Sequence, residues 1–321
     1  MTNSLLSISQ LYKSYPLSKK QFLHAVDGIS FDVHAGEVLG LVGESGCGKS
    51  TLGRCLLRLI PISSGKILFE KHDITHMKES ALRPLRARMQ MVFQDSYASL
   101  NPRRRIGDSL AAPLQVHKDA HGNKRSSAII RERLHELLDL VGLPPSTLNR
   151  YPHEFSGGQR QRINIARALT LSPRLIVADE PVSALDVSVQ AQIINLFADL
   201  QEKLSLTYIF ISHDLAVVRQ ISTRVAVMYL GTIVELGRTD SVLLSPMHPY
   251  TRALTEAAPR PVVGIRRPVA LRGDIPSPIN RPTGCRFHTR CPLSQPRCQT
   301  EEPLLKNMTD RHKVACHFPQ Y

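Results

Sequence analysis

A glycine-rich loop near the N-terminus limits what this chain can fold into more than any other feature. Residues 43–51 read GESGCGKST and match the spacing G-x-x-x-x-G-K-[ST]. A short apolar run of strand type, residues 37–42, precedes the loop, and residues 52–59 have helical spacing. Glycines let successive backbone N–H groups turn toward an anion at the positive end of a helix. Strand, loop and helix in this order therefore predict a phosphate-binding loop in an α/β core.

The residues of this loop are expected to bind a nucleotide in distinct ways. Lys49 is expected to neutralise charge on the β- and γ-phosphates, and the Ser50 hydroxyl to hold Mg²⁺. A glycine-rich turn without a ligand is the alternative, but the flanking strand and helix favour the binding site. The complete predicted set in the loop is Gly43, Glu44, Ser45, Gly46, Cys47, Gly48, Lys49, Ser50 and Thr51.

Two carboxylates follow a second strand of the predicted core. Residues 175–178 (LIVA) form a continuous apolar stretch, as expected of a parallel strand that is buried on both faces. Asp179 could hold Mg²⁺ through its water shell, and Glu180 could orient the water that attacks the γ-phosphate. Acids often mark only the solvated end of a strand, but the phosphate-binding loop upstream favours the catalytic interpretation.

Polar side chains also follow two further strands. His213 comes after the strand-like residues 207–211, which we expect to lie beside the strand that ends at Asp179. There His213 could bond the γ-phosphate or the attacking water, although a lone histidine is more often structural. Gln94 follows the strand-like residues 89–93 and could reach Mg²⁺ or the water.

A second anion-binding pattern lies at Ser156, Gly157, Gly158 and Gln159, immediately before an amphipathic helical stretch. A serine and two glycines that open a helix present a hydroxyl and free N–H groups at the positive end of the helix dipole. A simple capped helix is the alternative. Because the chain already has a loop for its own nucleotide, we expect this pattern to contact the nucleotide of another subunit.

The charge balance favours an anionic partner or surface. Lys and Arg number 41 against 27 Asp and Glu, which gives a net charge of +14. No run of about 18 apolar residues occurs, so we expect no membrane span. The N-terminal residues lack the basic and apolar segments of a secretion signal, which predicts a cytoplasmic protein. Its 6 cysteines would then be reduced unless they bind a metal.

Taken together and in this order, these motifs resemble the ABC transporter ATPases over nearly the whole chain. The resemblance implies a RecA-like P-loop core, an antiparallel β subdomain from the N-terminal strands and a helical subdomain at about 96–156. It implies ATP and Mg²⁺, with Mg²⁺ held through Ser50, Gln94 and Asp179. It also implies that Tyr15 stacks on adenine. Its D-loop corresponds to Ser183, Ala184, Leu185 and Asp186.

The mechanism of this family implies that two ATPase subunits enclose two ATP molecules, each between one loop and the partner's Ser156–Gln159. Glu180 and His213 then have catalytic roles. The family also implies that residues 95–108 and the helical subdomain transmit dimer closure to membrane partners. A P-loop kinase or GTPase does not account for Ser156–Gln159. A non-transport ABC ATPase that acts on nucleic acid or the ribosome remains the alternative, supported mainly by the charge.

Residues 94–103 and 247–251 resemble the dipeptide and oligopeptide importer ATPases. That subfamily implies a second ABC ATPase subunit, which is often a different chain, two transmembrane permease subunits and an extracytoplasmic peptide-binding protein. It implies no nucleic acid partner, and a peripheral position on the cytoplasmic face of the bacterial inner membrane. The sequence does not distinguish dipeptides, oligopeptides, nickel chelates or peptide antibiotics, or a homodimer from a heterodimer. The expected domains are an ATPase domain, 1–240, and an extension, 241–321.

The C-terminal extension contains a cluster of cysteines. Prolines are frequent in residues 240–284, which predicts an extended arm. Four thiolates could hold zinc or an iron–sulfur cluster, and their spacing alone leaves the metal open, with disulfides as a third choice. The family resemblance favours a [4Fe–4S] cluster over zinc. We expect the cluster to have a structural or regulatory role, because the sequence shows no obvious contact between this tail and the phosphate chemistry. The four residues are Cys285, Cys291, Cys298 and Cys316.

Overall fold

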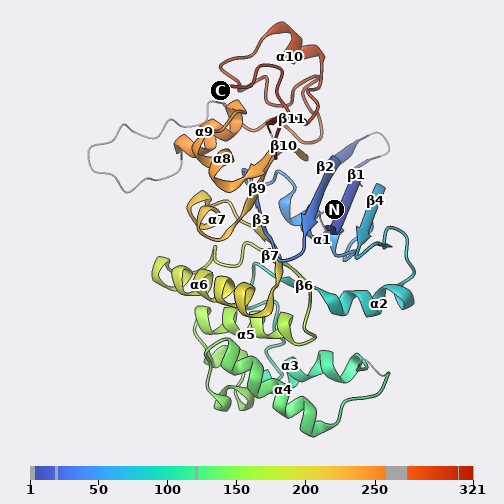
Figure 1. The fold of residues 1–321 in the computed structure, drawn as a ribbon, viewed down its shortest axis with the longest axis vertical. Coiled ribbons are helices and arrows are strands. Elements are labelled where there is room, and N and C mark those ends of the chain that lie inside the picture. The colour runs from blue at the N-terminus through green and yellow to red at the C-terminus, as the bar shows by residue number, and fades with distance from the viewer. Residues whose placement is uncertain (1–3, 19–20, 120–121, 258–272, 310, 321) are drawn as a thin grey trace. The chain divides into compact units, whose positions relative to one another are not determined.

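The chain forms two structural units, one from Met1–Thr75 with Phe210–Tyr321 and one from His76–Ile209. A computed structural model describes residues 4–18, 21–119, 122–257, 273–309 and 311–320 (Figure 1).

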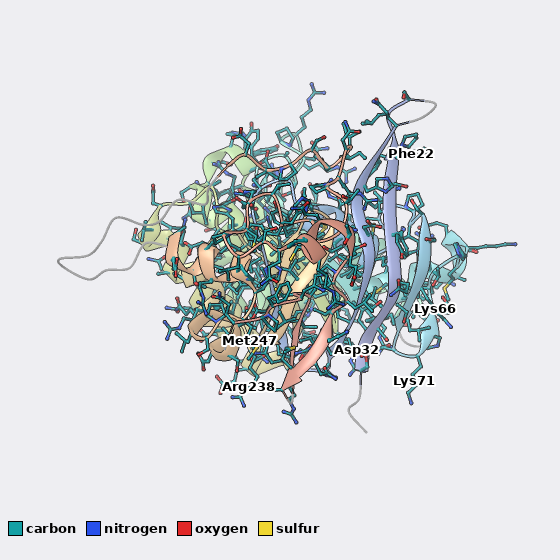
Figure 2. All side chains as sticks on the ribbon, turned by 90° about the horizontal axis from the view of Figure 1, so that it is seen from above. Phe22, Asp32, Lys66, Lys71, Arg238 and Met247 are labelled. Atoms are coloured by element: carbon teal, nitrogen blue, oxygen red, sulfur yellow. The ribbon has the colours of Figure 1, made fainter. Side chains whose placement is uncertain are left out.

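An antiparallel sheet opens the first unit. Its strand order is β2-β1-β4-β5, and every adjacent pair is antiparallel. Figure 2 shows Phe22 at the tip of the long β1–β2 ribbon. This sheet confirms the antiparallel β subdomain predicted for the N-terminal strands. The strands are β1 (Ser4–Pro16), β2 (Phe22–His34), β4 (Ser64–Phe69) and β5 (His72–Asp73).

The remaining strands of the first unit follow the order β11-β12-β10-β9-β3. β3 (Val38–Val42) pairs parallel with β9 (Arg224–Tyr229), and all five of its residues are buried. The structure confirms the short strand that the sequence before the loop predicts. Helix α1 (Lys49–Leu56) begins at Lys49, so the last residues of the loop form its first turn. The other elements are α7 (Leu215–Ile221), β10 (Thr232–Arg238), α8 (Thr239–Leu244), α9 (Pro249–Ala257), α10 (Pro296–Thr300), β11 (Lys306–Thr309) and β12 (His312–Val314).

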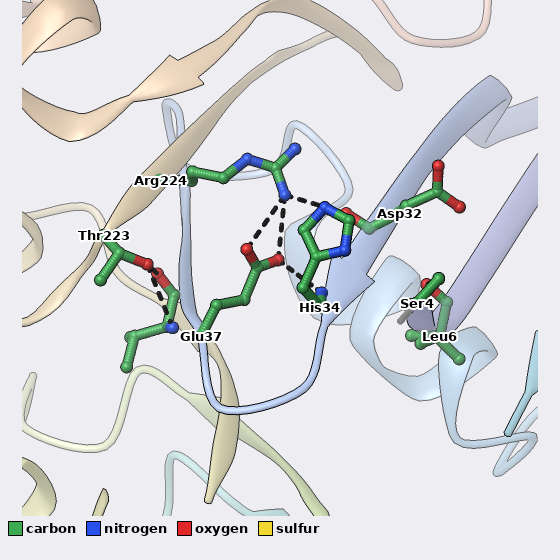
Figure 3. A network of polar contacts seen from close by, with 8 residues as sticks. Ser4, Leu6, Asp32, His34, Glu37, Thr223 and Arg224 are labelled. Carbon is green, nitrogen blue, oxygen red and sulfur yellow. Dashed lines mark hydrogen bonds and ion pairs between the residues drawn. The ribbon is translucent and has the colours of Figure 1, made fainter. Parts of the chain in front are cut away.

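A charged network fastens the turn between β2 and β3 to the start of β9 (Figure 3). Arg224 Nη1 donates to both carboxylate oxygens of Glu37, at 2.9 and 3.2 Å, and to the Asp32 carbonyl at 3.1 Å. The Glu37 carboxylate also accepts from the His34 N–H at 2.9 Å. Because both side chains are largely shielded from water, this ion pair is screened less than a surface pair. The network therefore ties the N-terminal sheet to the strand beside β3.

The C-terminal region is built into the first unit. β12 pairs antiparallel with β10, so the tail adds strands to the edge of that sheet. The predicted extended arm is wrong for residues 240–257, where α8 and α9 form. Proline does not prevent α9, because Pro249 occupies the first turn, where its missing N–H has no helical partner to lose. The later part of the predicted arm, residues 258–272, lies outside the described residues.

The second unit combines short parallel strands with helices. β6 (Met89–Val92) pairs parallel with β7 (Leu175–Asp179), and β8 (Thr207–Ile211), which begins in this unit, is next to β7 in the strand order, so these strands are neighbours as predicted. Helices occupy most of the segment predicted as a helical subdomain. Within that segment they are α3 (Ile106–Val116), α4 (Ser127–Leu140) and the 3₁₀ turns Pro145–Asn149 and Pro152–Glu154. The unit also contains α2 (Glu79–Arg88), α5 (Gly157–Leu169) and α6 (Val187–Leu204).

No helix in the described ranges is long and apolar enough to cross a bilayer.

A buried carboxylate attaches the C-terminal strands to this fold, and its removal gives a first prediction. Glu235 is 0% exposed and accepts from the backbone N–H groups of Met247 and His248, at 2.8 and 3.0 Å. Its other contact is His312 Nε2 at 2.8 Å. Glu235→Ala leaves these polar groups without their acceptor, so we expect the free energy of unfolding to fall by about 2–5 kcal/mol in urea titrations.

Lys66→Ala is the matched control for this measurement. Lys66 forms an ion pair with Asp73 at 3.6 Å, but both side chains are at least half exposed. Such pairs contribute little, so the change should stay within about 0.5 kcal/mol. Equal stability losses for the two variants would contradict the role assigned to Glu235.

Candidate functional site

The phosphate-binding loop packs so closely on its surroundings that two of its glycines cannot carry a side chain. A Cβ on Gly43 would lie 2.2 Å from the Met228 carbonyl oxygen, and one on Gly48 would lie 2.0 Å from the Ala25 carbonyl oxygen. Both glycines have positive φ, at 151° and 106°. L-residues rarely adopt these conformations, so the glycine spacing of the loop is a steric requirement.

Lys49 is held by the loop itself. Its side chain is buried, and Nζ donates to the carbonyl oxygens of Gly43 and Glu44 at 2.8 and 3.0 Å. Cys47 Sγ lies 3.9 Å from the same nitrogen, and burial raises the pKa of the Cys47 thiol. The loop therefore encloses a fixed positive charge at the start of α1, where the positive end of the helix dipole adds to it.

Two C-terminal residues contact this loop, and the sequence motifs predict neither as a site residue. The Arg290 guanidinium forms a forked pair with the Glu44 carboxylate, with Nη1–Oε2 at 2.7 Å and Nη2–Oε1 at 2.9 Å. Tyr250 Oη accepts the Glu44 backbone N–H at 2.9 Å. The expectation that the tail makes no contact with the phosphate site is therefore wrong. Tyr250 lies within the peptide-importer phrase at 247–251, whereas Arg290 carries no local signal.

Tyr15 and His213 also belong to the first unit. Tyr15 lies near the end of β1, half-buried, with Lys13 Nζ 4.6 Å from its ring centroid. His213 is exposed and follows β8, where the Ser212 N–H donates to the Leu41 carbonyl at 3.2 Å. This bond places the residue before His213 beside β3, the strand that leads into the phosphate-binding loop.

In the second unit, the structure brings together three residues predicted at strand ends. Gln94 Nε2 lies 3.1 Å from Glu180 Oε2 and 3.5 Å from Ser183 Oγ, which in turn donates to the Glu180 carbonyl at 3.1 Å. Asp179 is 2% exposed at the end of β7. Glu180 has φ of 45°, a left-handed conformation that is uncommon outside glycine and that often marks functional positions.

The Ser156–Gln159 pattern forms the N-terminus of α5. Ser156 Oγ accepts from the Gln159 N–H at 3.3 Å, and the Gln159 side chain accepts from the Ser156 N–H at 3.0 Å, which completes a capping box. A Cβ on Gly157 would lie 3.2 Å from Leu185 Cδ2, and one on Gly158 would lie 2.5 Å from Val189 Cγ1. Gly157 therefore packs against Leu185 of the predicted D-loop. Close packing within the chain explains why both positions are glycine.

The predicted site residues fall into two groups. The loop residues from Gly43 to Thr51, Tyr15 and His213 belong to the first unit, whereas Gln94, Asp179, Glu180 and the Ser156–Gln159 pattern belong to the second. Within the second group, the D-loop residues Ser183, Ala184, Leu185 and Asp186 lie between β7 and α6.

The four C-terminal cysteines line one small pocket. Cys285 and Cys298 are buried, and the Cys285 N–H donates to the Cys298 carbonyl at 2.8 Å. Burial raises the pKa of the Cys285 and Cys316 thiols to about 11 in each case, and burial also raises the pKa of Cys291. All four are free thiols, so no disulfide forms in this described region. Across the described residues, however, no group of three or more possible ligands is arranged to hold a metal ion.

Comparisons with known proteins agree with this geometry. Residues 26–183 match the family described as ABC transporter, and residues 234–298 match the oligopeptide/dipeptide transporter C-terminal region. The chain is 50% identical to the oligopeptide transport ATP-binding protein AppF of Bacillus subtilis, over 98% of this chain and 97% of AppF. It is 52% identical to the peptide ABC transporter ATP-binding protein y4tS of Sinorhizobium fredii, over 99% and 90% of the two chains.

Solved structures give the same fold. The dimeric ATP-binding cassette MJ0796 bound to ADP and Pi superposes with a TM-score of 0.66 at 26% identity, covering 73% of this chain and 98% of that one. CbiO1 of Clostridium perfringens, part of the transporter complex CbiONQ, gives a TM-score of 0.66 at 28% identity, covering 76% and 92%.

The close packing of Gly158 gives a second prediction. Gly158→Ala places a methyl group against Val189, so we expect the free energy of unfolding to fall by about 1–3 kcal/mol. Val189→Ala in the same chain removes the clashing Cγ1 and should restore at least half of that loss. Urea unfolding of the single and double variants measures both effects, with Ser188→Ala, an exposed change on the same helix, as the control.

A failure of Val189→Ala to restore any stability would show that the clash does not account for Gly158. The glycine would then need another explanation than packing within this chain.

Proposed function

We propose that this chain, which belongs to the ABC transporter ATPases with an oligopeptide/dipeptide transporter C-terminal region, hydrolyses ATP to power the import of small peptides. The enclosed ammonium of Lys49 at the start of α1 is the observation that carries the ATPase activity. Peptide import is supported by the C-terminal region and by the peptide-transport relatives.

The proposed nucleotide site draws on both groups of residues. The loop from Gly43 to Thr51 binds the phosphates, with Lys49 as the main counter-charge, and Tyr15 stacks on the adenine. Mg²⁺ is held through Ser50, Gln94 and Asp179. Support for the second group comes from the burial of Asp179 and from the contact between Gln94 and Glu180.

Glu180 and His213 are the proposed catalytic residues. Glu180 orients and deprotonates the water that attacks the γ-phosphate, and His213 contacts the phosphate or the same water. The left-handed conformation of Glu180 supports this role, because such strain persists at functional positions where the surrounding structure imposes it. The bond from Gln94 gives the carboxylate a fixed direction.

We propose further that Ser156, Gly157, Gly158 and Gln159 contact the ATP of a second subunit. The serine and glutamine of this pattern satisfy each other in the capping box, and the serine is exposed.

Within one chain, the segment after Gln94 is hydrogen-bonded to the helix that carries the serine–glycine pattern. Ser99 Oγ donates to Asn164 Oδ1 at 2.7 Å, and Asn164 Nδ2 donates to the Ser96 carbonyl at 3.1 Å. Asn164 lies on α5, the helix that begins with the serine–glycine pattern. A displacement of the segment that follows Gln94 would therefore be transmitted to the helix of that pattern through the hydrogen bonds of Asn164. The segment from Asp95 to Asp108 is the proposed contact with the permeases.

The proposed assembly contains a second ABC ATPase subunit, two permease subunits and an extracytoplasmic peptide-binding protein, at the cytoplasmic face of the bacterial inner membrane. The names of the peptide-transport relatives support this setting. The proposed domains are an ATPase domain, residues 1–240, which includes a helical subdomain at about 96–156, and a C-terminal extension, residues 241–321.

We also propose that the four C-terminal cysteines hold a [4Fe–4S] cluster. Their number and their common pocket fit the thiolate set that such a cluster needs, although the thiols are not arranged as a ready ligand group. The cluster, when bound, would cross-link the tail. The chain's own contribution is to gather the thiols on one apolar side of the unit, where Cys285 and Cys298 pack with Phe287.

The role of Glu180 gives a third prediction. In purified full-length protein, Glu180→Gln should lower ATP turnover by at least about 100-fold, because the amide cannot accept the proton from water. Binding of ATP should stay within about threefold, since the loop contacts remain. Steady-state phosphate release and equilibrium binding of a fluorescent ATP analogue measure the two quantities.

Glu132→Gln is the control for this substitution, because Glu132 is an exposed glutamate of α4 in the same unit. Turnover by Glu180→Gln comparable with that of Glu132→Gln would remove Glu180 as the catalytic carboxylate.

The cysteine proposal gives a fourth prediction. Protein purified without oxygen should contain about four iron and four sulfide per chain and absorb broadly near about 400 nm. Cys298→Ser should lower the iron content, whereas Cys55→Ser, which changes a buried cysteine of α1, should leave it unchanged. Colourless protein with one zinc per chain would favour the zinc alternative.

A further inference from the structure

Glu44, the second residue of the phosphate-binding loop, forms an ion pair with the C-terminal region through its side chain. Arg290 lies 246 residues from Glu44 in sequence, and its two terminal nitrogens reach the two carboxylate oxygens at 2.7 and 2.9 Å. The Arg290 side chain is only 4% exposed and that of Glu44 is 19% exposed. A forked pair that is shielded from water is directional and is screened far less than a surface pair.

The same loop residue is also held at its backbone. The Glu44 N–H donates to Tyr250 Oη at 2.9 Å. Tyr250 is fully buried, and its ring packs against Tyr229 and Phe287, with centroid separations of 4.6 and 5.4 Å. Tyr229 Oη lies 3.4 Å from Arg290 Nη1 as well. The Arg290 and Tyr250 side chains that bind Glu44 therefore contact an aromatic cluster that holds them in place. Their fixed positions can in turn fix the position of the loop.

Glu44 passes this constraint to the lysine of the loop. Its carbonyl oxygen accepts from Lys49 Nζ at 3.0 Å and from the Cys47 N–H at 3.3 Å. A continuous series of polar contacts thus runs from Arg290 through Glu44 to Lys49. Because the Glu44 carboxylate and N–H are both used by C-terminal residues, Glu44 acts as the anchor of the loop, and the remaining loop residues are left to meet the phosphates.

We propose that Arg290 is a positioning residue for the phosphate-binding loop, acting through Glu44 with Tyr250 as its backbone partner. The C-terminal region thereby sets the geometry in which Lys49 receives a nucleotide. This role rests on the proposed function, in which the loop binds ATP. Coupling between two sites is reciprocal, so ATP bound at the loop must also stabilise the segment around Arg290.

ATP-binding measurements on full-length protein test whether Arg290 affects the affinity of the loop for ATP. Arg290→Gln and Arg290→Lys both remove the forked pair, and Lys keeps the charge. We expect the Kd for ATP to rise by about 5- to 50-fold for Gln and by less for Lys. The matched control is Arg297→Gln in the same C-terminal region, because Arg297 forms an ion pair with Glu301 in which both side chains are more than half exposed.

A double-variant cycle identifies Glu44 as the residue through which Arg290 acts. Glu44→Gln should raise the Kd for ATP like Arg290→Gln, and the two changes together should raise it little further than either alone. Tyr250→Phe removes only the hydroxyl that accepts the Glu44 N–H and should also weaken ATP binding. Thermal unfolding without nucleotide reports whether Arg290→Gln folds. If it does not fold, Tyr250→Phe provides the test of whether contacts to Glu44 affect ATP binding.

Hydrogen exchange separates positioning from mere stabilisation of the tail. In wild-type protein, saturating ATP should slow amide exchange in residues 285–298, and in Arg290→Lys this ATP effect should be weaker even when the nucleotide site is saturated. Wild-type ATP affinity in Arg290→Gln and Tyr250→Phe, or an unchanged ATP effect on exchange in Arg290→Lys, would overturn the role of Arg290. Absence of ATP binding by the wild-type protein would instead overturn the proposed function on which that role rests.

Discussion

The close approach of the phosphate-binding loop to two neighbouring carbonyl groups is the constraint on which the first unit depends. Gly48 lies against Ala25 of β2, and Gly43 lies against Met228 of β9, at distances that exclude any Cβ. The loop therefore has one place in the unit, between the N-terminal sheet and the strands beside β3. The pair between Arg224 and Glu37 fixes the same two structures on another side. Together these contacts give Lys49 a rigid frame.

The second unit uses glycine in the same way for a different purpose. Gly158 lies against Val189, so the start of α5 and the start of α6 touch without an intervening side chain. Asn164 connects α5 to the segment that follows Gln94. These contacts therefore connect the residues proposed to face the nucleotide with those proposed to face a partner subunit. Such a connection is needed if nucleotide binding is to cause movement at the subunit interface.

Local patterns in the sequence predicted most of the fold correctly. Apolar runs predicted the buried strands β3, β7 and β8, because parallel strands covered on both faces need continuous apolar sequence. The serine–glycine pattern predicted the start of α5, because helix capping depends on residues only three positions apart. The prediction of an extended arm is wrong at α9, because the frequency of proline does not show its position in a helix. Pro249 lies in the first turn, where a helix tolerates it.

The sequence by itself determined which residues can carry the chemistry of phosphate binding. The loop and its lysine are defined by spacings within one strand, one turn and one helix, and the two acids by their place at the end of a second apolar strand. Only the tertiary structure decided what holds that chemistry in place. Arg290 and Tyr250 reach Glu44 from more than 200 residues away, through an aromatic cluster that no local pattern announces. A charged pair of this kind depends on how distant segments pack and which groups that packing shields from water, and both are properties of the folded chain.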